Sequence, residues 1–450
     1  MARTASEETR ITPPARLRDG ALRIEEQTLT ERDRFADLVR VVAILMVVLG
    51  HWLVAVVIVD DDRFAATQLL VLEPWTKWAT WVWQVMPLFF IVGGRVNAGS
   101  LRRNRDRGDT TSMWVRRRTR RLLRPMVPLL LLWVVLGPVL DAIGLPVPIV
   151  ERATEVAFMP LWFLVVYALI IVLAPLTSWL HRRAGWWVPA VATVLVLAVD
   201  VLDRIDVPVV GEANHLLVFG IAHQVGYLWA DGRLPFGRRG LWVAAGGLLW
   251  AALLVAVFDY PVSMVGVEGP TRSNAAPPTL AMVALTATQT GLLLALRGPC
   301  ERWLDRAVMA WAAVAVTGSM IITIFLWHMS ALVGVGALTY LVGWWPDVEP
   351  AGAAWWALRP VWVVLCVAAL VPLVVVFRGA ERVGEPRPGG PFVTVSGVLA
   401  AAGGLYLILE EGLYDVDRVL RVPVAAFALL FAGLLLLGAL GRSPDDDTSD

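Results

Sequence analysis

Three ionisable side chains lie within the first apolar segment of the chain. Asp37, Arg40 and His51 belong to the run DLVRVVAILMVVLGH, which is apolar enough to form a membrane-spanning helix. At about 100° per residue, the spacing from Arg40 to His51 completes three turns plus roughly 20°, and Asp37 precedes Arg40 by one turn. The spacing therefore predicts that all three share one helix face. Ionisable groups inside a bilayer are costly, and they typically face a bundle interior where they serve function.

The chemistry available to these groups is general-base catalysis and anion binding. A neutral imidazole at His51 can take the proton of an acceptor hydroxyl. Asp37 can pair with Arg40 at spacing i, i+3, and Arg40 would then anchor a phosphate-bearing donor. The alternatives are a histidine that only hydrogen-bonds a neighbouring helix, and an ion pair that only snorkels to the membrane surface. Because the three lie together, we take His51, Arg40 and Asp37 as candidate catalytic residues.

A basic run, RRRTRRLLRP, occupies residues 116–125. Guanidinium groups bind phosphates through paired hydrogen bonds, and Coenzyme A carries several phosphates. Arg118, Arg121 and Arg124 recur at every third residue and are the candidate donor ligands. The others are interpreted as anchors that favour the cytoplasmic side of the membrane, namely Arg116, Arg117 and Arg120.

Further polar residues lie inside apolar segments. Gly93-Gly94 would allow two helices to approach closely, and Arg95 and Asn97 after them would reach the same donor site. His328, His223 and Gln224 are candidates to face a central cavity, although structural hydrogen bonding explains each of them equally well. No metal site is expected, because the five histidines form no cluster with carboxylates.

The chain as a whole reads as an all-α polytopic membrane protein. Of its 450 residues, 58% are hydrophobic, more than a soluble protein of this length would carry. Twelve spans are expected, a ten-helix core and two more, at 38–60, 76–97, 121–141, 160–180, 186–202, 212–231, 241–258, 278–296, 312–342, 358–378, 391–409 and 421–440. The ninth is too long for one straight span, so it is either tilted or broken near Gly318.

Loop charges set the orientation. With both termini in the cytoplasm, most arginines fall in or beside cytoplasmic loops, as the positive-inside rule requires. The expected domains are a disordered tail over 1–36, a membrane core over 37–378, a linker over 379–390, two further helices over 391–440 and an acidic tail over 441–450. The linker, rich in Pro and Gly, is expected to be flexible. Lys77 is the only lysine, a bias typical of a GC-rich genome, which suggests the plasma membrane of a bacterium.

In order along the chain, these motifs resemble the acyltransferase-3 family of bacterial integral-membrane acyltransferases, over roughly 33–378. The residues that carry the resemblance are the Asp37, Arg40 and His51 set, the Phe89-Phe90-x-x-Gly93-Gly94 motif, the arginine run through Arg121 and Pro125, Leu161-Trp162-Phe163-Leu164 with Pro175, and Phe325-Leu326-Trp327-His328-Met329. The family usually has Ser-Gly where this chain has Gly93-Gly94. The resemblance implies transfer of an acyl group, often acetyl, from acyl-CoA to a hydroxyl, usually of an extracytoplasmic glycan or glycolipid.

We therefore expect an acyl-CoA-dependent O-acyltransferase that uses acyl-CoA as co-substrate, binds no cofactor and acts on an envelope or secondary-metabolite acceptor. Its partners would be acyl-CoA, a hydroxyl-bearing glycan or lipid acceptor and the bilayer. Nucleic acid is not expected, because the basic run lacks interleaved aromatic residues. The alternatives are a secondary transporter or exporter, in which the histidines would bind substrate or relay protons, and an inactive scaffold, suggested by Gly93.

Overall fold

The computed structural model describes residues 33–60, 63–269, 272–418 and 420–440. The tails expected to be disordered or acidic lie mostly outside these residues, at 1–32 and 441–450. Helix α2 begins at Arg34, inside the expected N-terminal tail, because Asp33 caps it: the Asp33 carboxylate accepts a hydrogen bond from the Ala36 amide at 3.0 Å.

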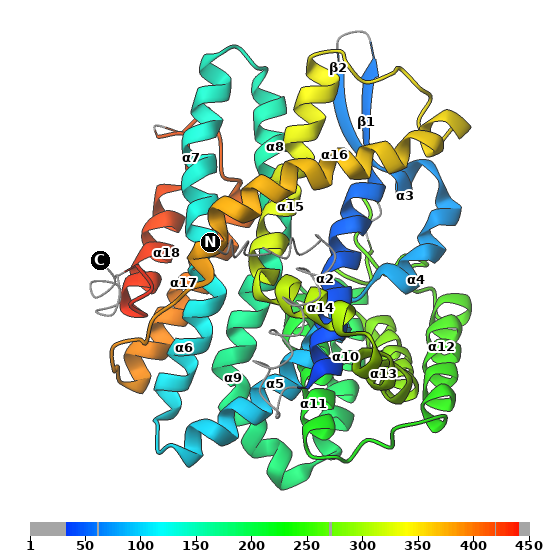
Figure 1. Cartoon of the computed structure of the whole chain (residues 1–450), viewed down its shortest axis with the longest axis vertical. Helices are drawn as coiled ribbons and strands as arrows, with labels where there is room; N and C mark the ends of the chain where they lie inside the picture. Colours follow the sequence, from blue (N-terminus) through cyan, green and yellow to red (C-terminus); the bar gives the residue numbers. More distant parts are fainter. Residues whose placement is uncertain (1–32, 61–62, 270–271, 419, 441–450) are drawn as a thin grey trace, which may run out of the picture.

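The fold is a bundle of helices with one β-hairpin (Figure 1). The first half contains α2 (Arg34–Val54), β1 (Ala55–Asp60), β2 (Arg63–Gln68), α3 (Leu69–Leu72), η1 (Pro74–Ala79), α4 (Thr80–Trp83), α5 (Met86–Asp106), α6 (Thr111–Leu123), α7 (Met126–Ala142), α8 (Val147–Phe158), η2 (Met159–Leu161), α9 (Trp162–Ala184) and α10 (Trp187–Arg204). The second half contains η3 (Val210–Glu212), α11 (Ala213–Ala230), α12 (Arg239–Val257), α13 (Leu280–Arg306), α14 (Val308–Ser319), α15 (Ile321–Gly336), η4 (Ala337–Leu341), α16 (Ala353–Phe377), η5 (Arg378–Glu381), α17 (Pro391–Glu411) and α18 (Val424–Leu436).

Eight helical segments of the described chain are long and apolar enough to cross a membrane, and each corresponds to one of the twelve expected spans. The other four expected spans fall on α5, α10, α11 and α18. The last of these has 13 residues and is short for a crossing, and α5 carries several charged residues. The protein is thus a multi-pass, overwhelmingly helical membrane protein.

Several expected spans differ in detail from the structure. The second was expected over 76–97, but α5 begins at Met86 and runs to Asp106. The first was expected to continue to residue 60, but α2 ends at Val54 and the chain turns into the hairpin, whose strands pair Ala55 with Gln68. The β-branched run Val56–Val59 explains the change, because such side chains favour extended backbone. Of the two alternatives for the ninth span, a tilt or a break, the structure shows the break, since α14 ends at Ser319 and Met320 leaves the helical conformation.

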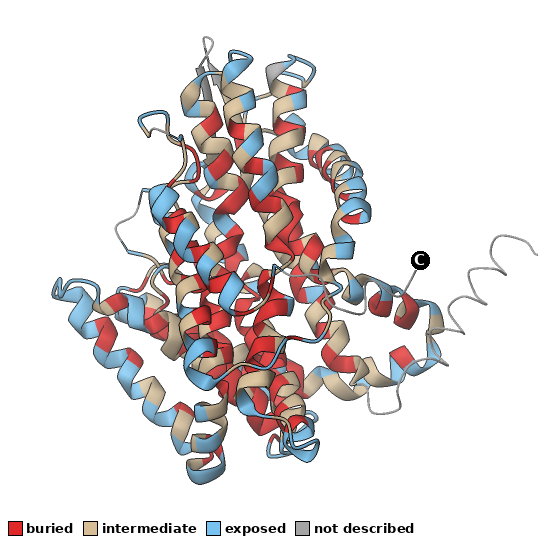
Figure 2. Ribbon diagram, turned by 90° about the vertical axis from the view of Figure 1, so that its left-hand side faces the viewer, coloured by how far each residue is buried: buried red, intermediate tan, exposed pale blue. Residues whose placement is uncertain are grey.

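The core contains one large cluster and a smaller one around α10, α12 and α13, with buried residues along the interior of the bundle (Figure 2). One hydrophobic cluster includes residues from α2, α5, α6, α9, α15 and α16, and also from α17 and α18. The expected packing role of the glycine pair is confirmed at Gly94, where an added Cβ would overlap the His223 carbonyl oxygen on α11 and lie 3.1 Å from Gly226 Cα.

The linker between α16 and α17 lies against α6. Glu385 accepts a hydrogen bond from Arg117 at 2.6 Å, and the Gly384 carbonyl accepts one from Arg120 at 3.1 Å. Glu381, at the end of η5, accepts hydrogen bonds from the backbone amide and the hydroxyl of Thr323 in the first turn of α15. The linker therefore joins the C-terminal helices to both α6 and α15.

Candidate active site

The N-terminal half of α2 holds the expected ion pair. Nη2 of Arg40 lies 3.0 Å from Oδ1 of Asp37. The Arg40 guanidinium also lies against the end of α14, because a Cβ added to Gly318 would be 3.2 Å from its Nη2. Nε of Arg40 is buried and has no hydrogen-bond partner among the described residues. The pair is thus enclosed by neighbouring helices.

Arg118 is the cation of the basic run that approaches this pair. It lies within electrostatic range of Arg40, Arg103 and Arg121. Its own contacts are weak: a 3.5 Å hydrogen bond to the Val96 carbonyl and a Trp114 ring 5.9 Å from its Cζ. Among the described residues no carboxylate pairs with Arg118. A partly buried cation surrounded by other cations is suited to bind an anionic ligand.

Four of the other arginines of the run hydrogen-bond other parts of the fold, namely Arg116, Arg117, Arg120 and Arg124. Arg116 is buried and donates to the Leu436 carbonyl at 2.7 Å, and Arg124, one of the candidate donor ligands, donates to the Arg382 carbonyl at 3.1 Å. Arg117 donates to Asp109, which lowers the pKa of that carboxyl. Arg121 is exposed. Arg116, expected to act as an anchor, instead fastens the C-terminal helices.

A second polar group lies where α5, α9 and α11 meet. Nδ2 of Asn97 lies 3.1 Å from Nε2 of His223, and the Tyr167 ring of α9 lies close to the same group. Tyr167 lies within electrostatic range of Arg40 and Arg118. A Cβ added to Gly93 would be 2.7 Å from the Tyr167 hydroxyl, so this phenol fills the space beside Gly93 that a serine side chain would need.

Tyr167 was not singled out from the sequence, because it lies in an apolar aromatic run with no charge nearby in the chain. Two of the candidate site residues make contacts other than the expected ones. Arg95 pairs with Asp33 at 3.4 Å, and Gln224 donates to the Thr177 carbonyl at 3.1 Å.

At the other end of α2, His51 meets His328 of α15. Nδ1 of His51 lies 2.9 Å from Nε2 of His328, and the two ring planes are inclined by only 17° with centroids 5.1 Å apart. Because α2 is one continuous α-helix across both residues, Arg40 and His51 lie on one face of it, as expected; Arg40 contacts α14 and His51 contacts α15. The rise of an α-helix separates their Cα atoms by about 16 Å along α2.

Two tryptophans hold the helices in place at this level. Trp52 donates its indole N–H to the His328 carbonyl at 3.0 Å, and Trp362 of α16 donates to the Trp52 carbonyl at 3.1 Å. His328 itself is fully buried. The backbone of α2 is therefore tied to both α15 and α16 beside His51.

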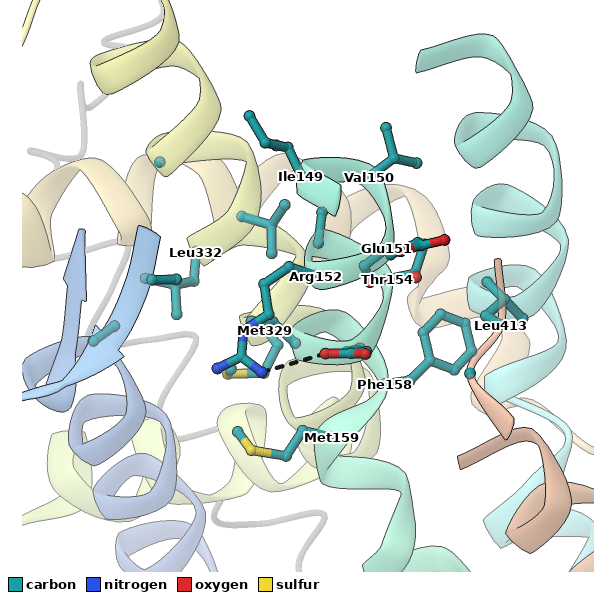
Figure 3. Close-up of a pocket in the computed structure, with 18 of the residues that line it drawn as sticks. Ile149, Val150, Glu151, Arg152, Thr154, Phe158, Met159, Met329, Leu332 and Leu413 are labelled. Carbon is teal, nitrogen blue, oxygen red and sulfur yellow. Dashed lines mark hydrogen bonds and ion pairs between the residues drawn. The ribbon is translucent and has the colours of Figure 1, made fainter. Parts of the chain in front are cut away.

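His51 lines a cavity of about 790 Å³ that surrounds α8 and reaches the hairpin, α15 and the loop after α17. Figure 3 shows Arg152 and Met159 of this region directed toward the hairpin side of α8, with Phe158 and Leu413 on the opposite side. Arg152 pairs with Glu155 at 3.3 Å and also with Glu268. His328, His223 and Gln224, expected to face a cavity, are not among its lining residues.

Residues 33–378 match the Acyl_transf_3 acyltransferase domain. The chain belongs to this family. No curated protein and no solved structure shows significant similarity to it. The matched region contains the Arg40 pair, Arg118, the two histidines and most of the cavity. The protein is therefore a multi-pass membrane acyltransferase. Its three candidate catalytic residues, Asp37, Arg40 and His51, all lie on α2.

Proposed function

We propose that this acyltransferase transfers an acyl group, most commonly acetyl, from acyl-CoA to a hydroxyl of a glycan, glycolipid or other envelope or secondary-metabolite acceptor in the plasma membrane of a bacterium. One observation carries the proposal: α2 links an arginine cluster at one end to a histidine that lines a cavity at the other. Anion binding and base catalysis are the two properties such a transfer requires.

The donor would bind at the arginine end. Arg118, with no carboxylate partner among the described residues, would bind the phosphates of Coenzyme A together with the exposed Arg121. Asp37 orients Arg40, whose position against Gly318 directs it toward the same region. The thioester arm of the donor would extend along α2 toward His51.

The acceptor would enter from the cavity. His51 takes the proton of the acceptor hydroxyl, and the oxygen attacks the thioester carbonyl carbon. The C–S bond breaks, the acyl group stays on the acceptor oxygen, and the Coenzyme A thiolate takes the proton back from the imidazolium. No covalent acyl-enzyme is required, because the acceptor attacks the donor directly.

Comparative mass spectrometry of cells tests this function. Envelope lipids, glycans and secreted metabolites are extracted from cells that express the wild type, His51→Ala or Val42→Ala. Val42 lies on the exposed side of α2 and serves as the matched control. We expect pairs of species that differ by one acyl group in the wild type and in Val42→Ala, and only the lighter member in His51→Ala.

Two outcomes would contradict the proposal. Acylated species that persist in His51→Ala cells would exclude His51 as the base. If no acyl-shifted pair occurs in any strain and an unmodified species accumulates inside His51→Ala cells, the protein exports that species instead.

A further inference from the structure

We infer that His328 is a positioning residue that fixes the tautomer of His51 and leaves Nε2 of His51 as the atom that accepts the proton. The inference rests on the proposed function for its catalytic meaning. Its structural content, the protonation of each ring nitrogen, stands on hydrogen-bond geometry alone. His328 does not touch the cavity, so it would act only through His51.

The chain of hydrogen bonds that ends at His51 begins at a backbone carbonyl of α15. Nδ1 of His328 lies 2.6 Å from the Phe325 carbonyl oxygen, one turn earlier in α15. A carbonyl oxygen only accepts hydrogen bonds, so Nδ1 of His328 must carry the proton. In a neutral imidazole the other nitrogen is then unprotonated. Nε2 of His328 therefore presents a lone pair.

The lone pair on Nε2 of His328 in turn determines which nitrogen of His51 carries the proton. Nε2 of His328 lies 2.9 Å from Nδ1 of His51, and two lone pairs at this distance would repel each other. Nδ1 of His51 must therefore donate, which leaves Nε2 of a neutral His51 without a proton. A carbonyl, two imidazoles and their separations thus select one of the two tautomers of His51.

Burial makes this selection strong. His328 is fully buried, so a missing hydrogen bond on its ring would not be replaced by water. Its backbone is also held, because its carbonyl accepts the Trp52 indole N–H at 3.0 Å. The ring of His328 therefore cannot turn toward another partner without leaving a buried polar group unsatisfied.

The arrangement suits a base that must gain and then return a proton. When Nε2 of His51 accepts the hydroxyl proton, the Nδ1–H of the imidazolium still donates to the lone pair of His328, which stabilises the charge. The Phe325 carbonyl at the end of the chain is not a base, so the proton cannot pass beyond His328. It therefore stays on the histidine pair, and the leaving thiolate takes it back from Nε2 of His51.

Nitrogen NMR of the histidine rings tests the inference directly. The full-length protein, labelled with ¹⁵N-histidine and held in lipid nanodiscs, gives separate signals for protonated and bare ring nitrogens, and a His51→Ala spectrum assigns those of His51. We expect Nδ1 of wild-type His51 to be protonated and Nε2 to be bare. A bare Nδ1 in wild-type His51 would overturn the inference.

Two variants of His328 supply the functional readout. His328→Phe keeps a ring of similar size but removes both nitrogens. We expect His51 to lose its fixed tautomer and kcat to fall about 10²- to 10⁴-fold, the usual contribution of a general base, with KM for acetyl-CoA unchanged. His328→Gln offers an amide oxygen to His51 and an amide N–H to Phe325, and should restore part of kcat together with the wild-type tautomer.

The outcomes separate the two proposals. If kcat is unchanged in His328→Phe, or if only KM changes, His328 does not position the base. If His328→Phe fails to fold, the wild-type spectrum and His328→Gln still decide the question. If the expected tautomer is present but no acyl transfer occurs in any assay, the proposed function fails while the tautomer assignment holds.

Discussion

Replacing Arg118 by glutamine should weaken the binding of acyl-CoA without destabilising the empty protein. Among the described residues Arg118 has no carboxylate partner, and its 3.5 Å hydrogen bond to the Val96 carbonyl is long. Hydrogen bonds to charged groups contribute about 1.5–3 kcal/mol each. At about 1.4 kcal/mol per tenfold change in affinity, the loss of one such bond to a phosphate raises the Kd by about 10- to 150-fold.

The assay is equilibrium binding of radiolabelled acetyl-CoA to the full-length protein in lipid nanodiscs. Arg124→Gln is the matched control, because Arg124 belongs to the same run but already donates to the Arg382 carbonyl at 3.1 Å. Its Kd should stay within about threefold of the wild type, a change of less than 1 kcal/mol.

Thermal unfolding of the empty protein supplies a second measurement. Removing an unpaired, partly buried cation relieves a desolvation penalty, so the midpoint of Arg118→Gln should equal or exceed that of the wild type. The stabilisation that acetyl-CoA gives the wild type should be lost in this variant. An unchanged Kd in Arg118→Gln, or an equal loss in both variants, would refute the assignment of the donor site.

Two further predictions concern the packing around the site. Gly94→Ala should destabilise the protein by about 1–3 kcal/mol, because its Cβ would lie 2.9 Å from the His223 carbonyl carbon. Gly220→Ala, on the same helix pair, is the control. Its Cβ would meet nothing within 4 Å, so the unfolding midpoint should stay unchanged or rise slightly. Glu381→Ala removes the acceptor of the Thr323 amide and should lower stability by about 0.5–2 kcal/mol, measured as the shift of the denaturation midpoint; an unchanged midpoint would contradict this role.

The sequence was sufficient for features that depend on local geometry. The shared face of Arg40 and His51 follows from the helical repeat, and the structure confirms it. The length of the ninth apolar segment predicted a tilt or a break near Gly318, and the structure has the break. The partner of His51 could not be predicted in the same way, because His328 lies 277 residues further along the chain and the pairing depends on how α2 and α15 pack.

The basic run shows why a spacing rule can assign residues to the wrong partner. Residues 118 and 124 differ by about 120° around a helix, although both belong to a series of every third residue. Residues 116, 120 and 124 span only about 80°, and these three donate to the C-terminal helices and the linker. Arg124 therefore belongs to the face that binds the linker, and Arg118 to the face directed toward Arg40.

The linker and the last two helices contact the elements that carry the candidate site, although they lie outside the matched acyltransferase domain. The Glu381 carboxylate accepts hydrogen bonds from the amide and the hydroxyl of Thr323, in the first turn of α15. Two residues later Phe325 offers the carbonyl that binds His328, and His328 binds His51. The first two turns of α15 thus carry both the linker contact and the carbonyl that orients His328. The cytoplasmic linker expected from the sequence therefore belongs to the structure that holds the candidate base.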